Sequence, residues 1–174
     1  MVTRGQQRVA VGRGWKAPEQ GMIHIRVDGG ISRNGEVGAV AAVCRDHTGN
    51  FRGSSTVVYP GITDPACLEM MACREAQALA QDLMFSKIVI SGDSKNTISD
   101  IGEEAGGLHS LITSEIVATK SLFEVCNFIF EGRNYNPDAH YLAKFATSLN
   151  QGRHLWIEDP HDPTCIPRVL VMNE

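Results

Sequence analysis

Three acidic residues stand where strands and a helix are expected to end or begin, and their order suggests a site for metal ions. Asp28 closes an apolar strand, Asp93 closes a later one, and Glu69 falls in the first turns of a long helix between them. Carboxylates that converge repel one another, so they are tolerated chiefly as ligands of hard cations such as Mg²⁺. Two such ions bridging a phosphate form an arrangement that hydrolyses phosphodiesters. We therefore treat the three acids as candidate metal ligands.

Each of these acids also has a simpler local interpretation. Asp28-Gly29-Gly30 is typical of an ordinary strand-ending turn. Glu69 suits the positive end of a helix dipole, and Asp93 can cap the helix that follows it. Glu75, six residues further along the same helix as Glu69, is a rival acid that we expect to be solvated or paired with Arg74 or Lys95. The metal interpretation depends on all three acids converging.

Two periodicities predict the elements that would carry these acids. Alternating apolar and polar residues over 22–28 predict a half-buried strand, and the near-continuous apolar run over 37–45 predicts a strand buried on both faces. Helical spacing predicts a helix from Pro65 to about Leu83, with Asp64 as its N-cap. The remaining predicted elements are strands over 51–59, 87–93 and 123–132, helices over 94–103, 110–122 and 137–150, a turn-rich loop over 29–36 and a hairpin turn over 46–50.

The order of these elements predicts an α/β protein. Three successive strands with short links indicate an antiparallel meander, and a strand that follows a long helix indicates a parallel crossover. We therefore expect a three-layer fold with a five-stranded mixed sheet, in which three antiparallel strands precede two parallel ones, and with helices on both faces. One domain should span 22–150, between an irregular lead-in over 1–21 and a loosely ordered tail over 151–174.

Composition narrows the class of protein further. The chain of 174 residues has a formal net charge of −4, which argues against a broad basic surface but permits a local basic patch. Five cysteines without a C-x-x-C motif favour free thiols in a reducing compartment over a zinc site. No apolar run approaches the ~20 residues of a membrane span, and the N-terminus lacks the apolar core of a secretory signal. We expect a protein of the nucleus or cytoplasm without membrane association, and organelle targeting stays open.

Six motifs, taken in order, resemble one known family. They are Val27-Asp28-Gly29-Gly30, the stretch 35–40 entering the second strand, 45–49 at the hairpin, 68–76 on the first long helix, 91–94 after the fourth strand, and 133–144 at the last helix. Over about residues 15–150 this series resembles the type 1 ribonuclease H (RNase H) family, in particular its plant reverse-transcriptase-like branch. The joint order and spacing carry the resemblance, because no single motif is specific.

The resemblance implies the RNase H fold and endonucleolytic hydrolysis of the RNA strand of RNA–DNA hybrids by a two-metal mechanism, with Mg²⁺ or alternatively Mn²⁺. It places Asp28, Glu69 and Asp93 as the first three metal-binding acids. His140 stands where the catalytic branch has a fourth acid, so it would act as a fourth metal ligand or as a proton carrier. Asp138 is two residues away and, on a helix, faces elsewhere. The implied partner of what we expect to be a monomer is an RNA–DNA hybrid or another nucleic acid.

Substrate contacts are expected near the first strand and the last helix. A hybrid duplex offers phosphates and 2′-hydroxyls in its minor groove, which backbone amides and small polar side chains can read. Gly29, Gly30, Ser32 and Asn34 fit that need. The resemblance adds Asn136 as a residue that orients the substrate backbone, although a helix-capping role explains it equally well. The chain lacks the Lys/Arg-dense helix that some members use, so we predict modest and salt-dependent affinity.

Two other functions remain open at this point. His140 in place of an acid, the acidic isoelectric point and the lack of a basic grip also fit a catalytically weak nucleic-acid-binding module derived from a retroelement. An exonuclease or a transposase-like relative of the same fold is a third candidate.

Overall fold

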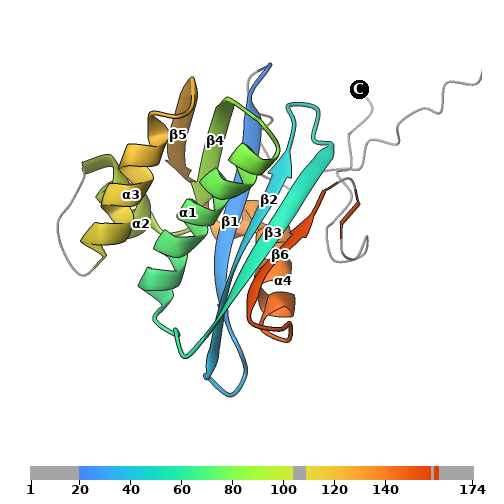
Figure 1. Ribbon diagram of the computed structural model, residues 1–174, viewed down its shortest axis with the longest axis vertical. Coiled ribbons are helices and arrows are strands. Elements are labelled where there is room, and N and C mark those ends of the chain that lie inside the picture. Colours follow the sequence, from blue (N-terminus) through green and yellow to red (C-terminus); the bar gives the residue numbers. More distant parts are fainter. Residues whose placement is uncertain (1–19, 104–108, 158, 161–174) are drawn as a thin grey trace, which may run out of the picture.

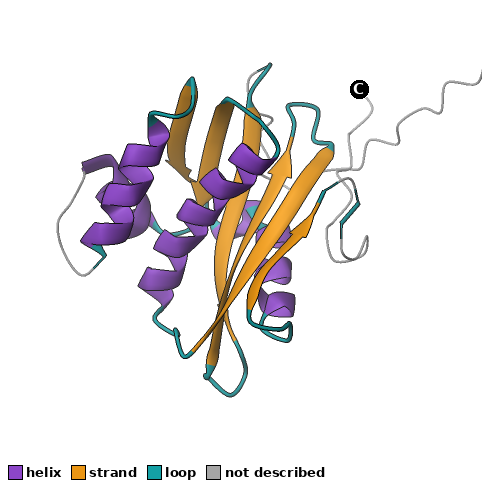
Figure 2. Ribbon diagram, viewed as in Figure 1, coloured by secondary structure: helices purple, strands orange, loops and turns teal. Residues whose placement is uncertain are grey.

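A six-stranded sheet with helices on both faces forms the part of the protein described by the computed structural model, which covers residues 20–103, 109–157 and 159–160 (Figure 1; Figure 2). Along the chain the elements are β1 (Ile23–Ile31), β2 (Val37–Arg45), β3 (Phe51–Pro60), α1 (Pro65–Asp82), β4 (Lys87–Gly92), α2 (Lys95–Glu103), α3 (Ser110–Lys120), β5 (Val125–Phe130), the 3₁₀ turn η1 (Arg133–Tyr135), α4 (Pro137–Ala146) and β6 (Gly152–Trp156). The strands lie in the order β5-β4-β1-β2-β3-β6. The antiparallel meander β1-β2-β3 and the parallel pairs β1–β4 and β4–β5 confirm the predicted mixed sheet.

The sheet has six strands rather than the predicted five. β6 pairs antiparallel with β3, from Ser54↔Trp156 to Val58↔Gly152. The prediction of a loosely ordered tail from residue 151 onward is therefore wrong for these residues, because a strand of only five residues satisfies the free backbone edge of β3. Residues 1–19 of the predicted lead-in over 1–21, and residues 158 and 161–174 of the predicted tail, lie outside the described residues.

β1 presents its alternate side chains to two different layers. Ile23, Ile25 and Val27 belong to the main core, which they share with residues of α1. The intervening polar side chains point to the opposite face, where α4 packs against β1, β2 and β3. The alternation that predicts this strand is thus an alternation between the α1 layer and the α4 layer. β2 is buried on both faces from Gly38 to Arg45, as its apolar run predicts.

β1 does not end at Asp28, as the sequence suggests, but continues through Gly29 and Gly30, which pair with β2. A Cβ atom on Gly29 would lie 2.9 Å from Cβ of Leu68 in α1, and one on Gly30 would lie 3.0 Å from the backbone carbonyl of Ala143 in α4. The two glycines are therefore strand residues, and their missing side chains let one helix approach the sheet closely on each face.

The other predicted elements are present with shifted ends. Asp64 caps α1 as expected, since its Oδ2 accepts a hydrogen bond from the Cys67 amide at 3.1 Å. Gly49 closes the β2–β3 hairpin with φ of +85°. β5 and α4 are shorter than predicted, since β5 spans Val125–Phe130 and α4 stops at Ala146; the 3₁₀ turn η1 lies in the connection between them. None of the helices in the described ranges has the length and apolar character to cross a membrane.

Replacement of Gly30 tests the close approach of α4. We expect Gly30→Ala to destabilise the protein by about 1–3 kcal/mol, because the new methyl group meets the Ala143 backbone and must displace the helix. Urea unfolding of both proteins measures the difference. Gly102→Ala in α2 is the control: a Cβ atom there meets nothing within 4 Å, so we expect stability unchanged or raised by up to about 1 kcal/mol. Equal stability of wild type and Gly30→Ala would contradict the packing argument.

Candidate metal centre

The register of two parallel strands places Asp28 beside Asp93. The ladder between β1 and β4 ends at the pair Arg26↔Ser91. Asp28 comes two residues after Arg26, and Asp93 comes two residues after Ser91. β4 stops at Gly92 while β1 continues along β2, so the two carboxylates meet where the parallel pairing stops. Only 8% of the Asp28 side chain and 17% of the Asp93 side chain are exposed.

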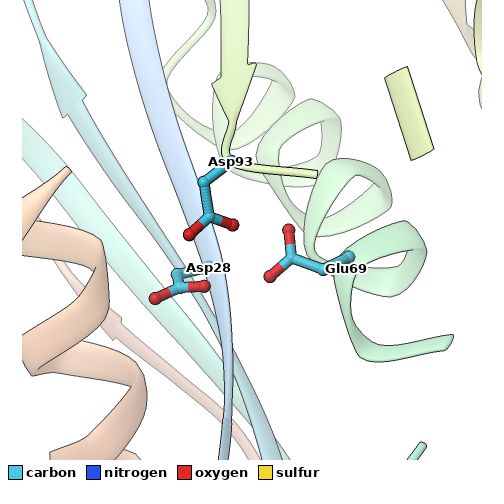
Figure 3. Close-up of side chains that lie close together, drawn as sticks. All are labelled: Asp28, Glu69 and Asp93. Atoms are coloured by element: carbon cyan, nitrogen blue, oxygen red, sulfur yellow. The ribbon is translucent and has the colours of Figure 1, made fainter. Parts of the chain in front are cut away.

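α1 adds the third carboxylate, Glu69, from its N-terminal half. Oxygen atoms of Asp28, Glu69 and Asp93 all lie within 4.8 Å of one another. Figure 3 shows the three side chains pointing toward one place from β1, α1 and the end of β4. The Gly29 amide lies between two of them and donates to Oδ1 of Asp28 at 2.9 Å and to Oε1 of Glu69 at 3.1 Å. The structure thus brings together the three acids that the sequence singles out.

Crowding and burial strongly perturb this group. Burial, a hydrogen bond with Asp28 and the charges of Asp28 and Asp93 raise the pKa of Glu69 to about 9, against a smaller opposing effect of the Gly29 amide. Burial and the nearby Asp28 also raise the pKa of Asp93, and Arg133 counteracts them. Without a cation, Glu69 therefore holds a proton at neutral pH. A bound divalent cation would relieve the repulsion and displace that proton.

The donor set suits a hard divalent cation. Three carboxylates within reach of one another offer the oxygen ligands that Mg²⁺ and Mn²⁺ take. Arg133 is the cation that contacts the group among the described residues, through Nε at 3.7 Å from Oδ2 of Asp93, and its side chain is 80% exposed. Such an exposed guanidinium compensates three carboxylates weakly. Asp28, Glu69 and Asp93 are therefore the residues that fit a metal ion.

His140 lies beside Asp28 but outside the three-carboxylate group. Its Nδ1 is 3.0 Å from Oδ2 of Asp28, and 39% of its side chain is exposed. Asp28 is therefore shared between the carboxylate group and the imidazole. Asp138 faces elsewhere, as predicted, because its carboxylate binds Arg45 instead of the site.

Asn136 is buried and fixes the start of α4 to β1. Only 3% of the residue is exposed, and its Nδ2 donates to the Val27 carbonyl at 2.7 Å. Val27 comes one residue after the last β1–β4 pair, so the amide of Asn136 replaces a strand partner. The predicted side-chain cap is wrong, because Asn136 makes no capping hydrogen bond, although Pro137 does open the helix. Contact of Asn136 with a substrate stays a prediction.

The structure does not bring Ser32 and Asn34 to the acids. They lie in the β1–β2 loop, where Ser32 Oγ donates to Oδ1 of Asn34 at 2.6 Å. Ser32 is four residues beyond Asp28, or about 13 Å along an extended chain. Gly29 and Gly30 do adjoin the site, but the amide of Gly29 already binds two carboxylates and both glycines face helices. Substrate contacts of these four residues stay predictions.

Sequence reasoning missed Arg133 as a neighbour of the acids. Arg133 opens the 3₁₀ turn η1, which directly follows β5 and leads into α4. No periodicity signals this turn, so the chain alone does not indicate that Arg133 reaches Asp93. The only available signal was its place three residues before Asn136 in the last motif.

A family model described as reverse transcriptase-like matches residues 26–146, which is more than half of the chain. The chain belongs to the reverse transcriptase-like family. The match spans all three acids of the carboxylate group and His140, and it ends at the last residue of α4. Comparison with curated protein sequences gives no match.

Solved structures show that this reverse transcriptase-like protein has the RNase H fold. RNase H1 from Halobacterium salinarum is 19% identical with a TM-score of 0.60, and the alignment covers 72% of this chain and 96% of that one. The N-terminal RNase H domain of a Mycobacterium tuberculosis protein is 20% identical with a TM-score of 0.65, over 72% and 93% of the two chains. LC11-RNase H1, in complex with an RNA/DNA hybrid, is 18% identical with a TM-score of 0.55, over 69% and 92%.

Replacement of Glu69 tests the repulsion in the metal-free centre. The raised pKa means that folded protein keeps a proton that the unfolded chain releases above about 4.5, so this group lowers stability progressively as pH rises from 4.5 toward 9. Glu69→Gln removes the repulsion, and we expect it to raise the melting temperature at pH 8 in EDTA by about 2–4 °C for each kcal/mol relieved.

Thermal unfolding between pH 5 and pH 9 measures this effect. The advantage of the variant should grow with pH in EDTA and shrink when Mg²⁺ is added, because the cation stabilises only the wild-type centre. A variant no more stable than wild type at pH 8 in EDTA would contradict the argument.

Proposed function

We propose that this protein hydrolyses the RNA strand of RNA–DNA hybrids endonucleolytically, with Mg²⁺ or Mn²⁺ bound at the carboxylate group. The observation that carries the proposal is the convergence of Asp28, Glu69 and Asp93 within 4.8 Å, where the parallel pairing of β1 and β4 stops. Membership of the reverse transcriptase-like family and the RNase H fold support it. The substrate class is supported by LC11-RNase H1, whose structure contains an RNA/DNA hybrid.

In this proposal each residue has a distinct task. Bound divalent cations would supply an activated water and stabilisation of the leaving oxygen. Asp28 lies between the other two carboxylates and His140, so its two oxygen atoms set the distance between these ligands. Glu69 and Asp93 complete the oxygen ligands. His140, which is partly exposed beside Asp28, serves as a fourth ligand or carries a proton between the site and solvent.

A second candidate function is supported by the position of His140. An imidazole takes the place of a fourth carboxylate and lies outside the three-acid group. A centre with one fewer negative ligand holds divalent cations less tightly. The alternative is therefore a module that binds nucleic acid through the same surface and cleaves it weakly or not at all.

Loss of Asp28 tests the proposed activity. We expect the wild-type protein with Mg²⁺ to cleave a labelled RNA–DNA hybrid at internal positions of the RNA strand, and Asp28→Asn to lower the rate by more than about 100-fold, because the shared ligand is lost. A gel-resolved time course measures both rates. Asp100→Asn, an exposed acid on α2, is the matched control and should cleave like wild type.

The outcome also separates the two candidate functions. Equal cleavage by wild type and Asp28→Asn would contradict the metal mechanism. Hybrid binding without cleavage, even with Mn²⁺, would favour the binding module. In that case His140→Asp should create or raise activity if the histidine alone limits catalysis.

Replacement of Arg133 tests whether the guanidinium beside Asp93 contacts the substrate. Its exposure leaves it free to bind a phosphate. We expect Arg133→Ala to weaken hybrid binding at low salt and to reduce the slope of log affinity against log salt by about 1. Fluorescence anisotropy with Asp28→Asn as the non-cleaving background measures both.

Arg52→Ala is the matched control for Arg133→Ala. Arg52 pairs with Asp46 over the same 3.7 Å, and it lies at the β2–β3 hairpin instead of the acidic site. An unchanged salt slope in Arg133→Ala, or an equal change in Arg52→Ala, would contradict a specific phosphate contact.

A further inference from the structure

The helix that carries His140 is tied to the sheet on two sides. On one side, Asn136 donates to the Val27 carbonyl and His140 meets Asp28. Residues two apart on a helix point in nearly opposite directions, so Asp138, between these two, faces the other side and binds Arg45 at the end of β2. These contacts restrain the rotation of α4 about its own axis.

The contact between Asp138 and Arg45 is a hydrogen-bonded ion pair that is almost fully buried. Oδ2 of Asp138 accepts from Nε of Arg45 at 2.9 Å and from Nη2 at 2.7 Å. Only 5% of the Arg45 side chain and 10% of the Asp138 side chain are exposed. Nη1 of Arg45 donates in addition to the Gly49 carbonyl at 3.0 Å, which anchors the guanidinium to the β2–β3 hairpin. Arg45 therefore holds Asp138 from a fixed point of the sheet.

A buried ion pair of this kind is a poor means of gaining stability alone. The cost of removing both charges from water offsets most of their attraction, and apolar residues of similar size stabilise as well or better. What the guanidinium adds is a defined orientation, because its Nε and Nη2 both donate to the same oxygen of Asp138. That orientation matters here, because rotation of a helix by about 10° moves a group at its outer radius of about 5–6 Å by about 1 Å. A displacement of that size near reacting groups can cost on the order of 100-fold in rate.

We propose that Arg45 and Asp138 are positioning residues for the metal centre, which set the rotation of α4 and thereby hold the His140 imidazole against Asp28. The pair touches neither metal nor substrate and acts only through His140. The catalytic part of this inference rests on the proposed nuclease function, whereas the placement of the imidazole does not.

A second ion pair in the same protein provides a matched control. Nε of Arg153 in β6 lies 2.7 Å from Oε1 of Glu75 in α1, and 8% of the Glu75 side chain is exposed. Glu75 was expected to be solvated or paired with a neighbouring cation; it is instead buried, and its partner is 78 residues away in the chain. The Arg153 side chain is 35% exposed and also pairs with Asp82. This pair joins a helix to a strand on the α1 side and at the far edge of the sheet, so it reports on the loss of a partly buried ion pair without disturbing α4.

The experiment compares the full-length wild type with Asp138→Asn, Arg45→Lys and Glu75→Gln. The first readout is the ¹⁵N and ¹H NMR signals of the His140 imidazole in metal-free protein, which report its tautomer and its hydrogen bond to Asp28 and require no activity. The second is kcat and KM on an RNA–DNA hybrid. We expect Asp138→Asn to shift the His140 signals and to lower kcat by about 10-fold or more with KM changed less than about threefold. Glu75→Gln should keep the wild-type His140 signals and kcat.

Several outcomes would overturn the proposal. It fails if the His140 signals and kcat stay unchanged in folded Asp138→Asn, or if Glu75→Gln produces the same changes. If Asp138→Asn does not fold, Arg45→Lys decides in its place, because it keeps the charge and loses the two-pronged geometry. If wild type cleaves no hybrid, the proposed function fails, and the NMR comparison still decides whether the pair positions His140.

Discussion

Repulsion among three partly buried carboxylates is the constraint on which the rest of this structure depends. Asp28, Glu69 and Asp93 lie within 4.8 Å of one another, and burial together with the two neighbouring acids raises the pKa of Glu69 to about 9. Flexible loops could not hold such groups together without a cation, because they would move apart. The protein instead places all three on the sheet or against it, on β1, on α1 and directly after β4. The rigid backbone of the strands and of α1 therefore holds together side chains that repel one another.

The glycines after Asp28 belong to the same solution. β1 has to pass between two helices at this point, because α1 brings Glu69 to one face and α4 brings His140 to the other. At Gly29 and Gly30 the strand has no side chain, and an added Cβ atom would lie 2.9 Å from α1 at Gly29 and 3.0 Å from α4 at Gly30. The amide of Gly29 then donates to two of the carboxylates, which partly offsets their repulsion. The Gly29-Gly30 pair thus allows both helices to pack closely against β1 and supplies an amide that reduces the repulsion between carboxylates.

Local patterns of the sequence reveal the elements of this centre but not its long-range contacts. Alternation along β1 and the helical spacing of α1 are local signals, and with the order of the acids they suffice to predict which carboxylates converge. The Asp-Gly-Gly stretch misleads, because glycine in a strand and glycine in a turn look alike until the neighbouring helices are known. The bonds of Asn136 to Val27 and of Asp138 to Arg45 join residues 109 and 93 positions apart, so no periodicity reports them. The strand β6 is missed because its five residues carry too little alternation.

Compared with a fourth acid, histidine at position 140 favours the stability of the metal-free protein over its affinity for divalent cations. A fourth carboxylate beside Asp28 would add to a repulsion that already keeps Glu69 protonated, whereas an imidazole can donate a hydrogen bond to Asp28 and reduce it. The metal-free protein is therefore less strained than a four-acid centre, and the same change removes one negative charge that would attract divalent cations. Nitrogen ligands suit Mn²⁺ better than Mg²⁺, because imidazole is the softer donor. In the proposed mechanism a centre of this composition depends more on the positions of its ligands than on their summed charge, and that dependence makes the orientation of α4 central to the proposed activity.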